Sequence, residues 1–145
     1  MTGIVATPLD AVDFGDLGDA LAGAGLPVSD LAEPGRVFFR FGDAAGLVGF
    51  GGVEGQGADR LLRSLLVVAD RRGGGLGRAM LAALEAQARE LGVVRLHLLT
   101  TTAALFFAAN GYAAADRARA PVPIAGSREF TALCPASAAY LVKAL

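Results

Sequence analysis

Several residue types that mark common protein classes are nearly missing from this sequence. Its 145 residues include no tryptophan, one histidine, one lysine and one cysteine. The single cysteine, Cys134, excludes an internal disulfide and suits a reducing compartment. The remaining basic residues are twelve arginines scattered along a chain of net charge −1, which gives no indication of nucleic-acid binding.

Long hydrophobic runs are also missing. No apolar stretch reaches transmembrane length, and the first residues lead to Pro8 without the basic segment of a secretory signal. We therefore expect a cytoplasmic protein that does not contact a membrane. A chain of this length forms one domain, residues 1–145, around one core.

Glycine, in contrast, is abundant, and its positions separate apolar runs of different periodicity. The runs 37–41 and 47–54 predict a hairpin, and 60–68 predicts the third strand of an antiparallel meander. Further strands are predicted at 3–7, 93–100, 112–115 and 139–145. Helices are predicted at 13–24, 76–91 and 103–109, with short helical segments after Ser29 and near 128–133.

The most informative stretch runs from Leu62 to Gly92. A strand ending near Val68 enters a loop with four glycines within five residues, followed by a periodic helix; these glycines are Gly73, Gly74, Gly75 and Gly77. The N–H groups at a helix N-terminus attract anions, and glycines let a phosphate approach the main chain closely. Arg71, Arg72 and Arg78 add positive charge. The loop therefore predicts a ligand that carries phosphate.

Two common phosphate-binding motifs do not fit this loop. A P-loop requires Lys and then Ser or Thr after the last glycine, but Arg78 and Ala79 stand there. A dinucleotide fingerprint starting at Gly73 would have Arg78 at its last glycine position. It would also need an acidic residue after the next strand, which instead carries Arg95 and His97.

The remaining pattern, Arg72-x-x-Gly75-x-Gly77 after a strand, resembles the pyrophosphate loop of the GNAT acetyltransferase superfamily. The order of strand, loop, helix, strand and short helix up to Gly111-Tyr112 is also similar. Two positions depart from the family pattern. Ala69 replaces a usual proline, and Phe107 replaces the tyrosine that often protonates the departing thiolate.

This resemblance implies the fold and the cofactor. The fold class is α/β (α+β): a mixed, mainly antiparallel sheet of six to seven strands flanked by helices. The implied cosubstrate is acetyl-CoA, with no metal, and the acceptor is the amine of a small molecule; the superfamily often forms homodimers. The residues implied in coenzyme binding are Leu65, Leu66, Val67, Arg72, Gly73, Gly74, Gly75, Leu76, Gly77, Arg78, Thr101 and Phe107.

A narrower resemblance spans nearly the whole chain. The phrases 25–31, 62–65, 98–103 and 129–138 look like the GNAT subfamily found with arsenic-resistance operons. It implies a resistance or detoxification role, with an arsenic-containing amino-acid analogue as acceptor. Cys134 alone cannot surround trivalent arsenic, which prefers several thiolates, so direct metalloid sensing is disfavoured.

Acetyl transfer needs a neutral nucleophile, a polarised thioester carbonyl and an exit for the thiolate. Glu54, at the end of a strand beside the coenzyme strand, is the candidate catalytic base, although such acids are often only solvated. Arg63 and Arg128 are candidates for holding an acidic substrate, and Thr100 and Cys134 are candidate pocket residues. One of the threonines at 100–102 is expected to cap the helix that follows.

Three other observations leave alternatives open. His97 alternates with leucines and shares a strand face with Arg95, which fits a partly solvated sheet face rather than a general base. Arg63 and Ser64 are expected on opposite faces of their strand. Because Phe107 has no hydroxyl, the thiolate proton must come from water, Tyr112, Tyr140 or the acceptor.

The alternative function is a non-catalytic coenzyme A binding module.

Overall fold

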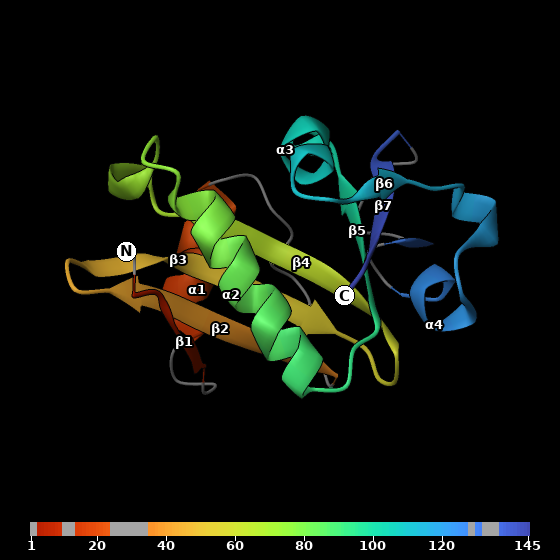
Figure 1. The fold of residues 1–145 in the computed structure, drawn as a ribbon, viewed down its shortest axis with the longest axis horizontal. Helices are drawn as coiled ribbons and strands as arrows, with labels where there is room; N and C mark the ends of the chain where they lie inside the picture. Colours follow the sequence, from red (N-terminus) through yellow and green to blue (C-terminus); the bar gives the residue numbers. More distant parts are fainter. Residues whose placement is uncertain (1–2, 10–13, 24–34, 128–129, 132–136) are drawn as a thin grey trace.

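The computed structural model describes residues 3–9, 14–23, 35–127, 130–131 and 137–145, without the side chains of Phe14 and Asp16. These residues form a seven-stranded sheet with helices on both faces (Figure 1). The strands are β1 (Val5–Pro8), β2 (Arg36–Asp43), β3 (Gly46–Glu54), β4 (Asp59–Val67), β5 (Arg95–Thr100), β6 (Ala113–Ala114) and β7 (Ala139–Ala144). The helices are α1 (Phe14–Gly23), α2 (Leu76–Glu90), α3 (Ala104–Ala109) and α4 (Val122–Ala125), with 3-10 turns η2 (Ala69–Arg71) and η3 (Arg117–Arg119).

The strand order is β1-β2-β3-β4-β5-β7-β6. Neighbouring strands are antiparallel except β4 and β5, which are parallel because α2 connects them across the sheet. Inside β3, Gly49 is required by packing: a Cβ there would lie 2.0 Å from the carbonyl oxygen of Leu66 and 2.8 Å from the sulfur of Met80. This glycine lets α2 lie close to the centre of the sheet.

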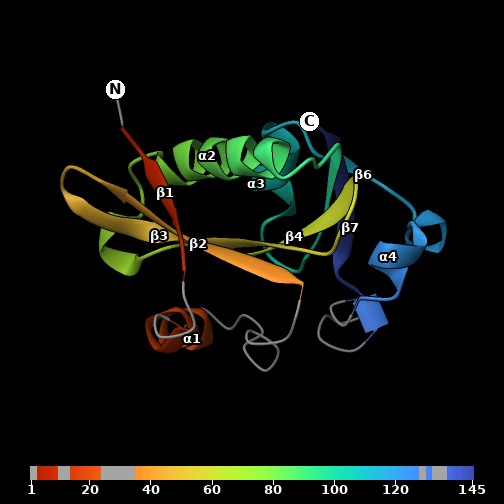
Figure 2. The same ribbon diagram turned by 90° about the horizontal axis from the view of Figure 1, so that it is seen from below.

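The two faces of the sheet carry different helices (Figure 2). On one face, α2 and α3 cover the main core through Met80, Leu84 and Phe107. On the other face, Leu17 and Leu21 of α1 pack on β2 to β4. At the far end of that second face, α4 packs on β4 and β7 in a small cluster of Leu61, Ile124 and Tyr140. Between α1 and α4, the second face carries the buried polar groups described below.

The predicted strands, the hairpin and the three main helices are confirmed. Two details differ. The strand predicted at 112–115 is reduced to two residues. The helix α4 was not predicted; Pro121 precedes it and Pro123 lies in its first turn, where a proline does not interrupt a helix. The short helix expected after Ser29 lies outside the described residues. Of the segment 128–133, the structure describes only Phe130 and Thr131, in a π-helical turn.

None of the helices in the described part of the chain is both long and apolar enough to cross a lipid bilayer.

Candidate active site

The sheet opens between β4 and β5. The two strands pair only at their beginnings, in three pairs that end with Leu61 opposite His97. Beyond this point β4 continues for six residues and β5 for three, which pair with β3 and β7 on their outer sides. We call the line between β4 and β5 the seam. Along the seam beyond Leu61, the main-chain N–H and C=O groups of β4 that point toward β5 have no pairing partner on that strand.

The main-chain direction at Val67 follows from its neighbour. The N–H of Val68 donates to the carbonyl of Val48 at 2.9 Å, so it points toward β3. Because successive N–H groups of a strand point to opposite sides, the N–H of Val67 points into the seam. The carbonyl of Val67 accepts a hydrogen bond from Nε of Arg72 at 2.9 Å.

A bulge lies in the middle of β4. The pairing between β3 and β4 shifts by one residue, so that Ser64 and Leu65 together oppose Gly51. Ser64 has φ 61°, a left-handed conformation that costs a non-glycine residue about 1 kcal/mol or more. The expectation that Arg63 and Ser64 face opposite sides is wrong, because the bulge interrupts the alternation. Nε of Arg63 donates to Oγ of Ser64 at 3.2 Å, and both side chains are buried.

The glycine loop continues from the end of β4 into α2. Gly75 immediately precedes α2 with φ 74° and offers no side chain to accept from the first N–H groups. The first turn of α2 also contains no acidic residue. The positive end of this helix is therefore not neutralised by its own side chains, which suits an anion.

Conformation explains only part of the glycine content. Gly73 and Gly75 have positive φ values of 87° and 74°, which favour glycine. Gly74 does not, and a Cβ there would meet no atom within 4 Å. At Gly77 a Cβ would make only ordinary contacts of 3.6 Å with Phe106 and Val67. Neither residue is required by packing within the described chain, and close approach of a ligand gives a reason for both.

The three arginines of the loop have different surroundings. The guanidinium of Arg71 forms an ion pair with Asp43 and donates to the carbonyl of Leu47, so it anchors the loop to the β2–β3 hairpin. Arg72 is exposed and is oriented by its bond to Val67. Arg78 is exposed and lines an open pocket of about 260 Å³ between α2 and α3. Arg72 and Arg78 are thus the better placed cations for a phosphate.

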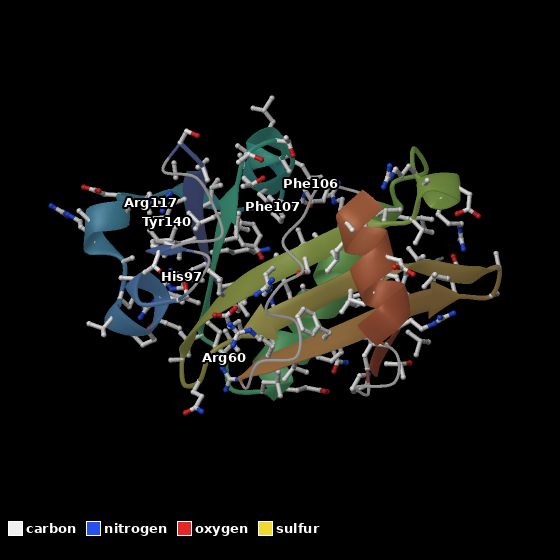
Figure 3. All side chains as sticks on the ribbon, turned by 180° about the vertical axis from the view of Figure 1, so that it is seen from behind. Arg60, His97, Phe106, Phe107, Arg117 and Tyr140 are labelled. Carbon is white, nitrogen blue, oxygen red and sulfur yellow. The ribbon has the colours of Figure 1, made fainter. Side chains whose placement is uncertain are left out.

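The helix α3 presents two aromatic rings toward α2. Phe107 is buried, and its ring packs edge-on against Tyr112 at 5.4 Å, so it belongs to the core. Phe106 lies closer to the glycine loop, because a Cβ at Gly77 would lie 3.6 Å from its ring. Sequence reasoning missed Phe106, since the family pattern directs attention to position 107. Figure 3 shows both rings at α3.

The threonines after β5 have local roles. Oγ1 of Thr100 accepts hydrogen bonds from the N–H groups of Ala103 at 3.0 Å and of Thr102 at 3.4 Å. These bonds close the turn that precedes α3, and the N-cap residue Ala103 has no side-chain capping bond, so the expectation that a threonine caps this helix is wrong. Thr101 is exposed beside it.

Glu54 belongs to a buried group of charges on the α1 face, which we call the Glu54 cluster: Arg36, Glu54, Arg63 and Ser64. Nη1 of Arg63 donates to Oε1 of Glu54 at 3.1 Å, and Nε of Arg36 lies 3.7 Å from the same oxygen. The side chain of Arg63 is fully buried, with its guanidinium 5.8 Å from the ring of Phe38. Glu54 is only 8% exposed, so it is not a solvated carboxylate.

A second polar group, which we call the His97 chain, consists of Asp59, His97 and Tyr140. Nδ1 of His97 lies 2.6 Å from the hydroxyl of Tyr140, and Nε2 lies 2.8 Å from Oδ1 of Asp59. Arg95 donates to both carboxylate oxygens of Asp59, at 2.7 and 3.0 Å. His97 is 2% exposed, so the expectation of a partly solvated face is wrong. Figure 3 labels His97 and Tyr140.

Hydrogen bonding and burial shift the pKa values in this chain. The hydrogen bond from Arg95 lowers the pKa of Asp59 to about 2, with a further contribution from His97. Burial raises the pKa of the Tyr140 phenol, and the negative charge of Asp59 adds to this effect. Asp59 is therefore ionised and Tyr140 is a neutral phenol near neutral pH.

The other buried tyrosine has a different partner. The hydroxyl of Tyr112 donates to Oε2 of Glu85 at 2.8 Å, and Nζ of Lys143 lies 3.0 Å from both oxygens of Glu85. Burial, followed by the charge of Glu85, raises the pKa of Tyr112 above its usual range. Of the two tyrosines considered for thiolate protonation, Tyr112 is thus held in the core beneath α2.

Arg128 and Cys134, predicted as substrate-binding residues, lie outside the described residues.

The sequence matches the family model of the acetyltransferase (GNAT) domain over residues 34–114, more than half of the chain. The chain therefore belongs to the GNAT acetyltransferase family. This family match does not extend to the arsenic-resistance subfamily. No curated protein matches the sequence.

Solved structures resemble the fold at low sequence identity. N-acetylglutamate synthase from Neisseria gonorrhoeae, in complex with coenzyme A and N-acetyl-glutamate, has a TM-score of 0.78 at 18% identity over 98% of this chain and 35% of that chain. A GNAT acetyltransferase from Staphylococcus aureus Mu50 has a TM-score of 0.75 at 14% identity over 99% of both chains. An aminoglycoside 6'-N-acetyltransferase complexed with coenzyme A has a TM-score of 0.68 at 16% identity over 97% of this chain and 96% of that chain.

The present chain thus spans about a third of the synthase, whereas it spans nearly all of the other two proteins. At these identities the likeness concerns the fold. It confirms the predicted mixed, mainly antiparallel sheet flanked by helices.

Proposed function

We propose that this chain is an acetyl-CoA-dependent N-acetyltransferase that acts on the amine of a small molecule. The observation that carries the proposal is the continuity of two features along β4. The strand ends in the open glycine loop at the N-terminus of α2, and the same strand parts from β5 after three pairs. A ligand with a diphosphate at one end and an extended arm fits this arrangement.

The diphosphate is assigned to the loop. Main-chain N–H groups of 73–78 donate to it, and Arg72 and Arg78 supply charge. The extended arm then follows β4 along Leu65 to Val67. The N–H of Val67, directed into the seam, is the proposed donor to the thioester oxygen, a contact that stabilises the developing oxyanion.

Thr101 and Phe107 complete the proposed coenzyme site, and Phe106 is added to it because of its position at Gly77. Several structural neighbours were solved with coenzyme A, which makes this the first ligand to test. The reaction places the acceptor amine at the thioester carbonyl, and Glu54 is the candidate base from sequence.

The acceptor is assigned to the face of the sheet opposite α2. Arg63 is the proposed contact on that face. Thr100, Arg128 and Cys134 remain contacts proposed from the sequence alone. N-acetyl-glutamate and L-arginine accompany the Neisseria synthase in its two structures, so amino acids belong in an acceptor panel. An arsenic-containing amino-acid analogue belongs there too, because of the subfamily resemblance of the sequence.

The test is a calorimetric titration with acetyl-CoA and with CoA, together with a thioester-cleavage assay over a panel of amines. The decisive variant is Gly74→Glu. A side chain is sterically tolerated at Gly74, so the fold should persist while the carboxylate occupies the diphosphate site. We expect coenzyme affinity to fall at least ~100-fold, since a like charge replaces a bound anion.

Gly15→Glu is the matched control. It introduces the same side chain at another glycine without close neighbours, on α1, which packs on the opposite face of the sheet. This variant should bind acetyl-CoA as the parent does. Equal affinity of Gly74→Glu and the parent would refute the coenzyme site, and binding without turnover of any amine would favour a coenzyme-binding module.

A further inference from the structure

The His97 chain lies where the seam opens. His97 is the last residue of β5 that pairs with β4, and Tyr140 is paired with Leu99, two residues further along β5. Its hydroxyl reaches back to His97. These side chains therefore lie at the point where the two strands part, with His97 2% and Tyr140 5% exposed.

The neighbours of Tyr140 show on which face of the sheet the His97 chain lies. Tyr140 packs with Leu61 and Ile124, on the face opposite the α2 core. Leu61 and Arg63 point to this same face, because side chains two apart on a strand share a side. The His97 chain and the Glu54 cluster thus lie on the face assigned to the acceptor. The Glu54 cluster lies on β2 to β4, and the His97 chain joins β4, β5 and β7 where the two central strands still pair.

The hydrogen bonds define which ring nitrogen carries the proton. The carboxylate of Asp59 can only accept, so Nε2 of a neutral His97 carries the hydrogen. Nδ1 is then the acceptor, and the Tyr140 hydroxyl donates to it at 2.6 Å. The phenol is directed at a nitrogen that can take its proton.

We propose that the His97 chain removes the proton from the acceptor ammonium, with Tyr140 as the group that touches the amine and His97 as the proton acceptor. This inference rests on the proposed acetyltransferase function and names a base different from Glu54. The ammonium gives one proton to Oη of Tyr140 as the phenolic proton passes to Nδ1 of His97. No phenolate forms, and the resulting imidazolium is paired with Asp59.

Acetyl transfer then proceeds from the neutral amine. The nitrogen lone pair attacks the thioester carbon, the C–N bond forms and the C–S bond breaks. The second proton of the nitrogen passes to the thiolate sulfur, which requires no phenol at Phe107. The imidazolium returns the first proton to water after product release. The overall reaction yields an amide, CoA thiol and one proton.

The charged and aromatic groups around His97 come from several elements. Asp59 from β4 faces Nε2, and Arg95 from β5 is bound to that carboxylate. On the β7 side, Tyr140 stacks with the imidazole at 5.9 Å between ring centroids. The guanidinium of Arg117 of η3 lies over the ring of Phe130 at 5.0 Å, and α4 contributes the apolar Ile124.

Because His97 is the only histidine, its nitrogen resonances can be assigned without ambiguity. Nitrogen-15 NMR of the full chain at neutral pH should show the tautomer with hydrogen on Nε2. The kinetic arm uses the panel amine that the parent protein acetylates fastest, with kcat/KM measured from about pH 6 to about pH 10. His97→Gln should lower kcat/KM about 100-fold at neutral pH, within the usual contribution of a general base.

The pH profile distinguishes proton transfer from a structural role. For His97→Gln and Tyr140→Phe, the deficit should shrink as the pH approaches the pKa of the amine, because the acceptor then arrives already neutral. Tyr112→Phe is the matched control, since it removes a hydroxyl from the other buried tyrosine. Any deficit in that variant should stay constant with pH.

Three results would overturn the inference. The Nδ1–H tautomer would remove the acceptor for the phenol, and parallel pH profiles of the parent, His97→Gln and Tyr140→Phe would assign these residues a structural role only. The absence of turnover by the parent on every amine would refute the proposed function itself, and the relay with it. The parent's own activity therefore separates the two failures.

Discussion

The Glu54 cluster and the His97 chain face the same side of the sheet, yet they differ in what a proton can do there. In the Glu54 cluster, one carboxylate is shared by two guanidinium groups at 3.1 and 3.7 Å. Protonating Glu54 would remove the negative charge that faces the buried guanidinium of Arg63. In the His97 chain, the central group is an imidazole between a carboxylate and a phenol. It can gain a proton while its bond to Asp59 is kept and strengthened.

This comparison indicates that the two polar groups have different roles: the Glu54 cluster holds buried charge, and the His97 chain is suited to proton transfer. The Glu54 cluster fixes the conformation of the β4 bulge, because Arg63 bridges Glu54 and Ser64. The His97 chain carries the titratable group. Four predictions test this division, beginning with the largest expected effect on stability or activity.

Arg63→Met should lower the free energy of unfolding by about 3–5 kcal/mol, because it removes the nearer cation from the buried carboxylate of Glu54. Urea denaturation monitored by circular dichroism measures the effect. Arg95→Met is the control, since its side chain is 50% exposed, and exposed ion pairs contribute little to stability. Similar losses in the two variants would contradict the assignment of a buried structural charge to Arg63.

Glu54→Gln should lower kcat/KM by a factor that does not change between about pH 6 and about pH 10. The reason is that the amide would weaken the anchoring of Arg63 without removing the proton acceptor, His97. Steady-state kinetics with the best panel amine provides the measurement, and coenzyme affinity should stay the same. A deficit that disappears at high pH would return the role of base to Glu54.

Tyr112→Phe should destabilise the fold by about 1–3 kcal/mol, because it leaves an oxygen of buried Glu85 with one fewer donor. Tyr140→Phe should cost about 1 kcal/mol, the usual net contribution of one hydrogen bond. Thermal unfolding at neutral pH compares them. For activity, in contrast to stability, Tyr140→Phe should cause the larger loss. A larger activity loss in Tyr112→Phe would contradict the role given to the His97 chain.

Acid should weaken the His97 chain by a small amount. The pKa of Asp59 is about 2 in the folded protein and near 3.9 in an unfolded chain, so ionised Asp59 stabilises the fold above about pH 4. This contribution, about 1–2 kcal/mol, is lost as the pH falls from about 4 to about 2. Asp59→Asn should show a flatter stability curve over this range, and an unchanged slope would contradict the shift.

Local sequence patterns predicted the parts of this structure that depend on local rules. The strand, glycine loop and helix around residues 62–92 follow from periodicity and glycine spacing, and the same pattern indicated the family. Alternation also placed His97 and Arg95 on one face correctly, since both contact Asp59. What alternation could not show is that this face is covered by Ile124 and Phe130.

The contacts between residues distant in the sequence could not be predicted from local patterns, for physical reasons. The pairing of Asp59 with His97 depends on the parallel register of β4 and β5. These strands are far apart in the sequence, because the glycine loop and α2 lie between them. The bulge at Ser64 reverses the side on which one residue lies, and no glycine or proline marks it in the sequence of β4. Glu85 of α2 is buried through its contacts with Tyr112 and Lys143, which come from distant segments of the chain.

The seam between β4 and β5 also determines how the molecule would respond to force. Strands β1 to β4 lie on one side of it and β5 to β7 on the other, joined within the sheet by only three backbone pairs. If Val5 and Ala144 were pulled apart, tension would cross the sheet at this line. The seam and the packing of α2 over it would yield first, and each half-sheet would remain intact as a separate mechanical unit.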